Sequence, residues 1–296
     1  MKNPKRNFAA KRNPAGIFLL LVFLAAVFIF PLFVTLAGSF MTESAITVNV
    51  SSKVSTFDLA AGITEKFKKI LLIPSPASAE QYGEVLIWQP PFLALLFNSL
   101  KITVPVTLGA LGIAVLSAYG FTRWRWKYKE RLFTVYIVVM LMPLQAVLVP
   151  NYIIAALMGI QKNYLAIILP GIFSPFAVFL LRQGMKAVPQ AYFEAADMDG
   201  AGSWYILFYI LLPQLKSSIA ALCMLTFIEY WNLVEQAVIF IDDFRLEPLS
   251  IYLSRLADSR TGIIFAASCV YMFLPLWFLF AGQKDLEKGI ELSGVK

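Results

Sequence analysis

A short acidic segment at residues 194–200, EAADMDG, lies between two long apolar runs of the chain. Its carboxylates are too costly to desolvate for the segment to lie in lipid. The small alanines allow another surface to approach closely, and Gly200 can adopt the left-handed backbone that turns sharply out of a short helix. The segment therefore predicts a docking helix outside the membrane, or alternatively an ordinary amphipathic connector. The candidate docking residues are Glu194, Ala195, Ala196, Asp199 and Gly200.

A second polar group lies in the apolar sequence FIEYWNLVEQ, at residues 227–236. Glu229, Asn232 and Gln236 are spaced i, i+3 and i+7, so on a helix they share a face. Ionisable side chains at membrane depth are costly and usually face a cavity or a partner. Carboxylates and amides can bind sugar hydroxyls, and aromatic rings can stack on sugar rings, so a passage lined by this group would be chemically suited to a sugar. The candidate passage residues here are Glu229, Tyr230, Trp231, Asn232 and Gln236.

Two alternatives remain open for these carboxylates. Glu229 and Glu235 can instead lie near the outer interface or pair across subunits. In an ion-coupled carrier, either of them would be the ion or proton site.

Gln145 and Asn151 are polar residues in another apolar run, which also contains Pro143 and Pro150. Proline in a membrane helix frees a backbone group that neighbouring helices or water must satisfy. Both polar side chains are therefore candidates to face the same passage. Hydrogen bonding between helices explains them equally well.

Several kinds of chemistry are excluded by residue type. The chain has no histidine, which excludes an imidazole proton relay and a histidine-ligated metal. Cys223 and Cys269 lie in apolar runs and are expected to be small buried hydrophobic residues, not metal ligands or a disulfide. The phosphate-binding pattern G-x-x-x-x-G-K-[ST] does not occur, so nucleotide chemistry must belong to another polypeptide. The chain is expected to be neither an enzyme nor a cofactor protein.

The composition places these residues in a membrane protein. The chain is 59% hydrophobic and 15% charged, whereas soluble domains carry about 25% charged residues. Its net charge of +7 is concentrated beside apolar runs. Basic residues lie between Lys2 and Arg12, between Arg123 and Arg131, and at Arg182 and Lys186. This placement indicates membrane topology, with the basic side in the cytoplasm, and not nucleic-acid binding.

Six apolar runs are long enough to cross a hydrocarbon core of about 30 Å as helices. The sequence therefore predicts an all-α membrane protein with one transmembrane domain over residues 1–296 and both termini in the cytoplasm. The first run is longer than a signal-peptide core and is expected to be retained. The expected spans are residues 16–39, 94–120, 132–155, 163–183, 217–240 and 262–282.

Two long segments connect these spans. Residues 40–93 are expected to form an extracytoplasmic loop, and residues 186–213 a cytoplasmic loop that carries the acidic segment. Apolar residues recur at helical spacing over residues 59–71, against lysines. They predict an amphipathic helix that lies on the membrane, on a partner or on its own protein.

The acidic segment begins a longer pattern, EAA-x3-G-x9-I-x-L-P, which this chain matches at every fixed position. The chain therefore resembles the permease subunits of ATP-binding-cassette importers, the binding-protein-dependent transport inner-membrane components. Further stretches, including MPLQAVLVPNYII and FIEYWNL, are similar to the carbohydrate-uptake branch and its maltose-permease G-like members. The fixed positions are Glu194, Ala195, Ala196, Gly200, Ile210, Leu212 and Pro213.

The resemblance implies the type I importer permease fold, six transmembrane helices with a cytoplasmic coupling helix. It implies a second permease, an ATPase dimer that binds ATP and Mg²⁺, and an extracytoplasmic substrate-binding protein. The substrate would be a sugar, an oligosaccharide, carried across the inner membrane of a prokaryote. The competing hypotheses are the ion-coupled secondary transporter and a membrane scaffold without transport.

Overall fold

The computed structural model describes residues 14–50, 77–88, 90–124, 126–255 and 261–294 of the chain. In these ranges the regular structure is helical, apart from an isolated antiparallel bridge between Met41 and Ala77. This confirms the all-α fold class. The helix expected at 59–71 lies outside the described residues.

The chain divides into two compact units. Unit 1 comprises Met1–Val85 and Ser259–Cys269, and unit 2 comprises Leu86–Asp258 and Val270–Lys296. The last helix, α16 (Thr261–Gly294), contributes its first residues to unit 1 and the rest to unit 2.

Unit 1 contains α1, a helix with a fully apolar surface. The most apolar stretch within Ala15–Ser39 is long enough and apolar enough to cross a membrane. The end of α1 approaches α16 closely, because a Cβ on Gly38 would overlap the Phe265 ring. The other helices of this unit are short. The described elements are α1 (Pro14–Ser39), α2 (Glu43–Val50), α4 (Glu80–Gly83) and a π-helical turn (Glu84–Trp88) that continues into unit 2.

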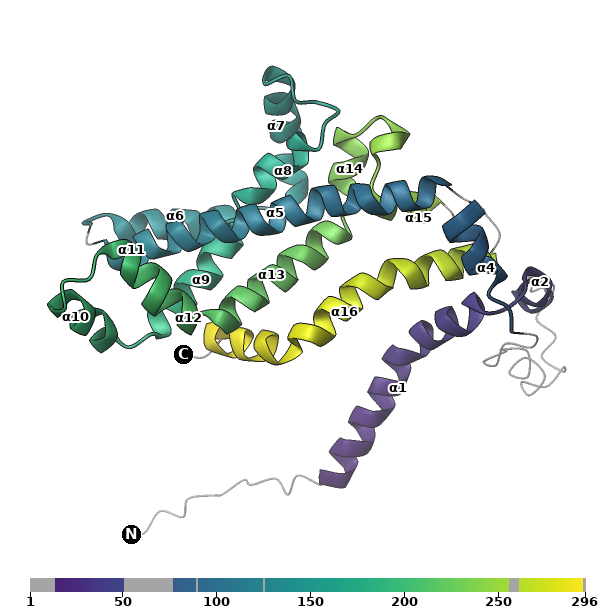
Figure 1. The fold of residues 1–296 in the computed structure, drawn as a ribbon, viewed down its shortest axis with the longest axis horizontal. Coiled ribbons are helices and arrows are strands. Elements are labelled where there is room, and N and C mark those ends of the chain that lie inside the picture. The colour runs from purple at the N-terminus through teal and green to yellow at the C-terminus, as the bar shows by residue number, and fades with distance from the viewer. Residues whose placement is uncertain (1–13, 51–76, 89, 125, 256–260, 295–296) are drawn as a thin grey trace, which may run out of the picture. The chain divides into compact units, whose positions relative to one another are not determined.

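Unit 2 is built around the long helix α5 (Pro90–Arg123). Three helices pack along it: α8 (Leu165–Ile172), α9 (Pro175–Ala187) and α13 (Lys216–Trp231) (Figure 1). Small and branched apolar residues of α5 and α9 fill the space between them. This core includes Ala114, Ala118, Ala177, Leu181 and Met185.

The expected span over 132–155 is not one straight helix. The chain forms α6 (Lys129–Met140) and α7 (Leu144–Leu157), which meet at 98°. Pro143 lies in the break with an extended backbone, ψ 145°. Proline cannot donate the backbone hydrogen bond that would continue the helix, which accounts for the break.

The expected span over 217–240 also ends early. Helix α13 stops at Trp231, and α14 (Glu235–Phe240) begins after a short irregular segment. By contrast, α16 continues to Gly294, well past the expected end at 282. The segments η3 (Phe244–Leu246) and α15 (Leu249–Arg255) follow α14.

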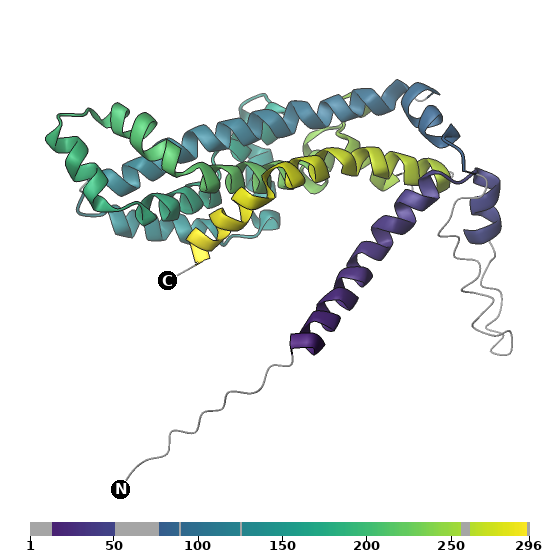
Figure 2. The same cartoon turned by 60° about the horizontal axis from the view of Figure 1, so that its bottom comes forward.

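Between α9 and α13 the chain forms α10 (Gln190–Met198), α11 (Ser203–Tyr205), a π-helical segment η2 (Ile206–Leu211) and α12 (Leu212–Gln214). Both views place α10 and α11 at one end of unit 2, whereas α14 lies towards the other end of α5 (Figures 1 and 2).

By length and composition, four described helices can cross a membrane. The number rises to six if each of two bent pairs counts as one span. The pairs are α6 with α7, and Ser203–Gln214 with Lys216–Trp231, which meet at 77°.

Candidate functional site

The acidic segment forms the second half of helix α10 and the turn after it. The amide of Ala201 donates to the carbonyl of Ala196 at 2.9 Å, and the amide of Gly200 donates to that of Asp197 at 3.2 Å. These paired bonds form a Schellman motif, which requires a left-handed residue after the helix. Gly200 is that residue, with φ +74°. The predicted short helix and glycine turn are therefore confirmed.

The two faces of α10 differ. Phe193 and Ala196 are buried, each 5% exposed, and belong to the core of unit 2. The expectation that both alanines are available to a partner therefore applies only to Ala195. The other candidate docking residues, Glu194, Asp199 and Gly200, are exposed.

Arg123, the last residue of α5, holds α10 against the core. Its Nη2 donates to Oδ1 of Asp197 at 2.7 Å, and its guanidinium lies 5.3 Å from the centroid of the Phe193 ring. One helical turn earlier, the Tyr119 hydroxyl donates to the carbonyl of Ser203 at 2.9 Å. The sequence identified Arg123 as a topology cation and gave no sign of this partner, which is 74 residues away.

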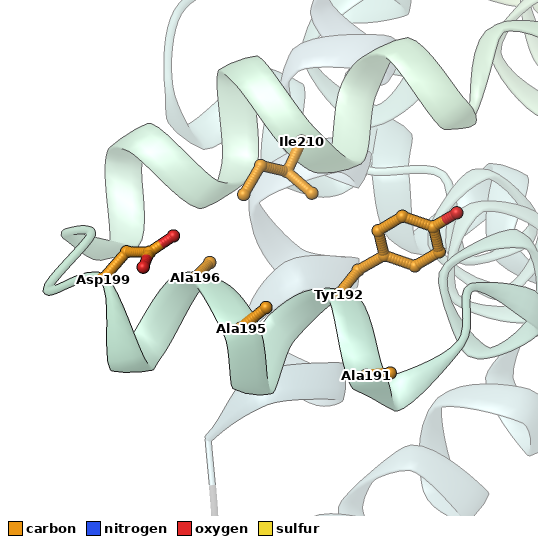
Figure 3. Close-up of a pocket in the computed structure, with 6 residues that line it drawn as sticks. All are labelled: Ala191, Tyr192, Ala195, Ala196, Asp199 and Ile210. Atoms are coloured by element: carbon orange, nitrogen blue, oxygen red, sulfur yellow. The ribbon is translucent and has the colours of Figure 1, made fainter.

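A cavity of about 420 Å³ lies between α10 and η2 (Figure 3). Tyr192 and Asp199 lie towards opposite ends of α10, and Ile210 lies opposite on η2 (Figure 3). A second cavity of about 590 Å³ lies beside the turn at Gly200 and shares Ala196, Asp199 and Ile210 with the first. Hollows therefore flank the exposed edge of α10. The first is lined by Ala191, Tyr192, Ala195, Ala196, Asp199 and Ile210.

The candidate passage residues gather around a third cavity, of about 280 Å³, where α13 ends and α14 begins. Because the helix stops at Trp231, Glu229, Asn232 and Gln236 do not share a helix face as expected. The irregular segment brings them to the same cavity instead. Its lining is Leu144, Glu229, Tyr230, Asn232, Leu233, Val234, Glu235 and Gln236.

Hydrogen bonds connect this cavity to neighbouring helices. Gln145 Nε2 on α7 donates to Glu235 Oε2 at 3.0 Å. The Tyr271 hydroxyl on α16 lies 3.0 Å from Asn232 Oδ1 and 2.7 Å from the Trp231 carbonyl. Tyr230 rests against α8, because a Cβ on Gly171 would lie 2.8 Å from its hydroxyl oxygen.

Two expected passage residues are placed elsewhere. Trp231 is 0% exposed, and its ring stacks on Phe227 and Tyr271. Its Nε1 donates to the Tyr271 carbonyl at 3.3 Å, so its position is that of a core residue. Asn151 is half-buried on α7 and does not belong to the described lining of the cavity. In the part of the chain that the structure describes, no cluster of three or more acidic or cysteine side chains could hold a metal.

Comparison with known proteins identifies the family. The family described as "Binding-protein-dependent transport system inner membrane component" matches residues 110–284, more than half of the chain. This range contains both the α10 segment and the cavity residues.

Named relatives agree with this match. The lactose transport system permease protein LacG of Rhizobium radiobacter is 30% identical over 203 residues, covering 68% of this chain and 74% of LacG. The osmoprotective compounds uptake permease protein GgtD of Synechocystis sp. is 30% identical over 223 residues, covering 73% of this chain and 74% of GgtD. The sn-glycerol-3-phosphate permease protein UgpE of Pectobacterium atrosepticum is 27% identical over 205 residues, covering 68% and 73%.

The fold matches a chain in the crystal structure of a bacterial ABC transporter that imports the acidic polysaccharide alginate. The TM-score is 0.76 at 19% identity, with 95% of this chain and 99% of that chain covered. A second structure, of a bacterial alginate ABC transporter with a pentasaccharide-bound periplasmic protein, gives a TM-score of 0.57 at 16% identity, covering 70% and 82%. The chain therefore belongs to the binding-protein-dependent transport system inner membrane components, the permease subunits of ABC importers.

Proposed function

We propose that this chain is one of two permease subunits that form the passage for an oligosaccharide and that a separate ATPase drives through helix α10. The observation that carries the proposal is the division of α10 into two faces. Phe193 and Ala196 fix the helix to unit 2, while Glu194, Ala195 and Asp199 are free to meet another protein.

A docking role explains features of α10 that a connector does not need. The helix ends in a Schellman turn and an ion pair fixes its position, so its exposed face is preorganised. Preorganisation lowers the entropy cost of binding a partner. The chain itself has no phosphate-binding loop, so the ATP and Mg²⁺ would be bound by that partner.

The third cavity supports a sugar passage. Its described lining combines two carboxylates, two amides and a tyrosine with apolar residues, and such a few convergent polar groups are typical of small-molecule sites. Glu229, Tyr230, Asn232 and Gln236 would contact the sugar, and so would Glu235, which the bond from Gln145 holds in place. The named relatives and structural neighbours include a lactose permease and alginate importers, which favours a saccharide.

The remaining partners follow from the same proposal. A soluble binding protein would deliver the sugar on the outer side, as the periplasmic protein bound to the alginate transporter suggests. The α10 loop and both termini would lie in the cytoplasm of a prokaryote, where the ATPase is. An ion-coupled carrier with Glu229 or Glu235 as its ion site is disfavoured by family membership, since these permeases depend on a binding protein.

The docking role is tested with Gly200→Asp and Glu194→Lys in the assembled transporter, by co-purification of the ATPase. Both variants are expected to lose the ATPase. Gly159→Asp is the matched control for the first, because Gly159 also has positive φ, +68°, and open space around it. Glu80→Lys is the control for the second, as an exposed charge reversal on α4 in unit 1. Sugar uptake by vesicles that lack any ATPase would disprove the proposal.

A further inference from the structure

Arg182 carries a full positive charge into the core of unit 2. It lies on α9, and its side chain is 1% exposed. The sequence predicts that it marks the cytoplasmic side of the membrane, and the structure adds that its side chain is buried. A buried charge is costly unless it is paired, so its surroundings need an explanation beyond topology.

Those surroundings come from two other helices. Its Nη2 donates to Oε1 of Glu130 at the start of α6. Its guanidinium lies 3.7 Å from the centroid of the Phe133 ring on α6 and 5.9 Å from that of Phe121 on α5. Among the described residues, its Nε has no hydrogen-bond partner. Planar stacking of this kind suits arginine and not lysine.

Phe121 also connects Arg182 to α10, the proposed docking helix. Phe121 packs on the core cluster that contains Phe193 and Ala196 of α10. Two residues further along α5, Arg123 binds Asp197 of α10. Arg123 therefore connects α5 to the docking helix, and Arg182 connects α9 to both α5 and α6.

Helix α6 leads in turn to the cavity. It meets α7 at 98°, and Gln145 on α7 donates to Glu235 in the cavity lining. A displacement of α6 would therefore reach a cavity residue, provided that α6 follows α10.

We propose that Arg182 is a positioning residue that locks α6 to α5 and α9, so that these helix ends and α10 move as one rigid body. The proposal rests on the proposed function only for the origin of the force, an ATPase docked on α10. The lock itself is a property of this chain.

The lock is tested by the distance between spin labels at Gln190→Cys on α10 and Val138→Cys on α6, both exposed positions. Cys223 and Cys269 are replaced by alanine, and the transporter is assembled in lipid with its ATPase. Without Arg182 substitutions, we expect one narrow distance distribution that ATP, Mg²⁺ and vanadate leave unchanged. Arg182→Met should broaden it and make it depend on nucleotide.

Two further variants make the result decisive. Glu130→Gln removes the ionic partner at a side chain that is 65% exposed, so it spares the fold even if Arg182→Met does not. It should also broaden the distribution, and Arg182→Lys should rescue only part of the loss. Lys216→Met removes an exposed charge at the start of α13, outside the Arg182–Glu130 pair, and is the control, expected to match the unsubstituted chain.

The proposal is overturned if Glu130→Gln and a folded Arg182→Met keep the narrow, nucleotide-independent distance. It is equally overturned if the distance already changes with nucleotide in the unsubstituted transporter. Either result leaves the proposed function intact when the ATPase still co-purifies. Failure of any ATPase to co-purify counts against the proposed function, while the width of the distribution without nucleotide still tests the lock.

Discussion

At α10 the inner side chains are held by packing and ion pairing, whereas at the α13–α14 break several polar side chains face open space. Asp197 and Phe193 are both engaged by Arg123, and the helix end is closed by a Schellman turn. Around the cavity the helix is interrupted and Glu229, Asn232 and Glu235 are exposed. Under the proposed function, the first region would keep its shape when the ATPase pulls on it, and the second would exchange its present polar contacts for contacts with the sugar.

The contrast follows from what the contacts at each site would have to do. Contacts that keep a helix in place must survive when a partner pulls on it, so they are internal to the chain. Contacts that a substrate uses must be available, and a preformed internal network would compete with the sugar hydroxyls. Tyr230 is the largest exception, because it is close-packed against Gly171 although it lines the cavity. Asn232 and Glu235 are exposed but also keep one bond each to a neighbouring helix, to Tyr271 and Gln145.

The largest change in stability is expected from Gly171→Ala, which tests the close packing of Tyr230 against Gly171. The new Cβ would lie 2.8 Å from the Tyr230 hydroxyl oxygen and 3.0 Å from Val106 Cγ1. Overpacking of this kind costs about 1–3 kcal/mol. Thermal unfolding of the purified protein measures it. Gly112→Ala on α5 is the control, because nothing lies within 4 Å of its Cβ position. If Gly171→Ala and Gly112→Ala unfold at the same temperature, Tyr230 is not held tightly against Gly171.

A smaller change is expected from breaking the hold on α10 with Asp197→Asn. The pair is partly exposed, at 24% for Arg123 and 51% for Asp197, and such pairs contribute about 0.2–1 kcal/mol. A double-mutant cycle with Arg123→Met isolates this coupling. We also expect Asp197→Asn to lower the rate of substrate-stimulated ATP hydrolysis by a larger factor than the small loss in the free energy of unfolding would explain. A coupling energy of zero together with an unchanged rate of hydrolysis would show that the Arg123–Asp197 ion pair does not hold α10 in place.

The smallest change in stability is expected from Glu235→Gln at the cavity. The amide oxygen can still accept from Gln145 Nε2, so the free energy of unfolding should change by less than about 0.5 kcal/mol. Sugar uptake is nevertheless expected to fall, up to about tenfold, because a charge-assisted bond to a sugar hydroxyl becomes a neutral one. Uptake can be measured with a saccharide that the unsubstituted transporter is found to carry, with Glu287→Gln on α16 as an exposed control. Full uptake by Glu235→Gln would exclude this carboxylate from the passage.

The local features of α10 were predictable because they depend on neighbours in sequence. The glycine turn follows from one residue that tolerates positive φ, and the inward face of Phe193 and Ala196 follows from their i, i+3 spacing. That spacing is the signal in the sequence from which the burial of both residues could be predicted. The membrane-helix pattern was likewise readable from apolar runs.

The remaining features depend on partners far away in sequence. Arg182 meets Glu130 across 52 residues, and Trp231 meets Tyr271 across 40, so neither burial could be read from local pattern. The end of α13 lacks a glycine or proline signal. Asn232 donates instead to the Ile228 carbonyl at 3.0 Å, a side-chain bond that competes with helix continuation.

The right-angled junction of α6 and α7 has a mechanical consequence. Helices α6 and α7 meet at 98° around Leu141–Pro143, so they form the two arms of an angled lever. A small tilt of the α6 arm becomes a displacement of the α7 arm along a perpendicular direction, with an amplitude set by the ratio of their lengths. A straight span would merely have tilted as a whole. If the 98° angle is kept during transport, the interruption at Pro143 would let unit 2 change the direction of a movement as well as transmit it.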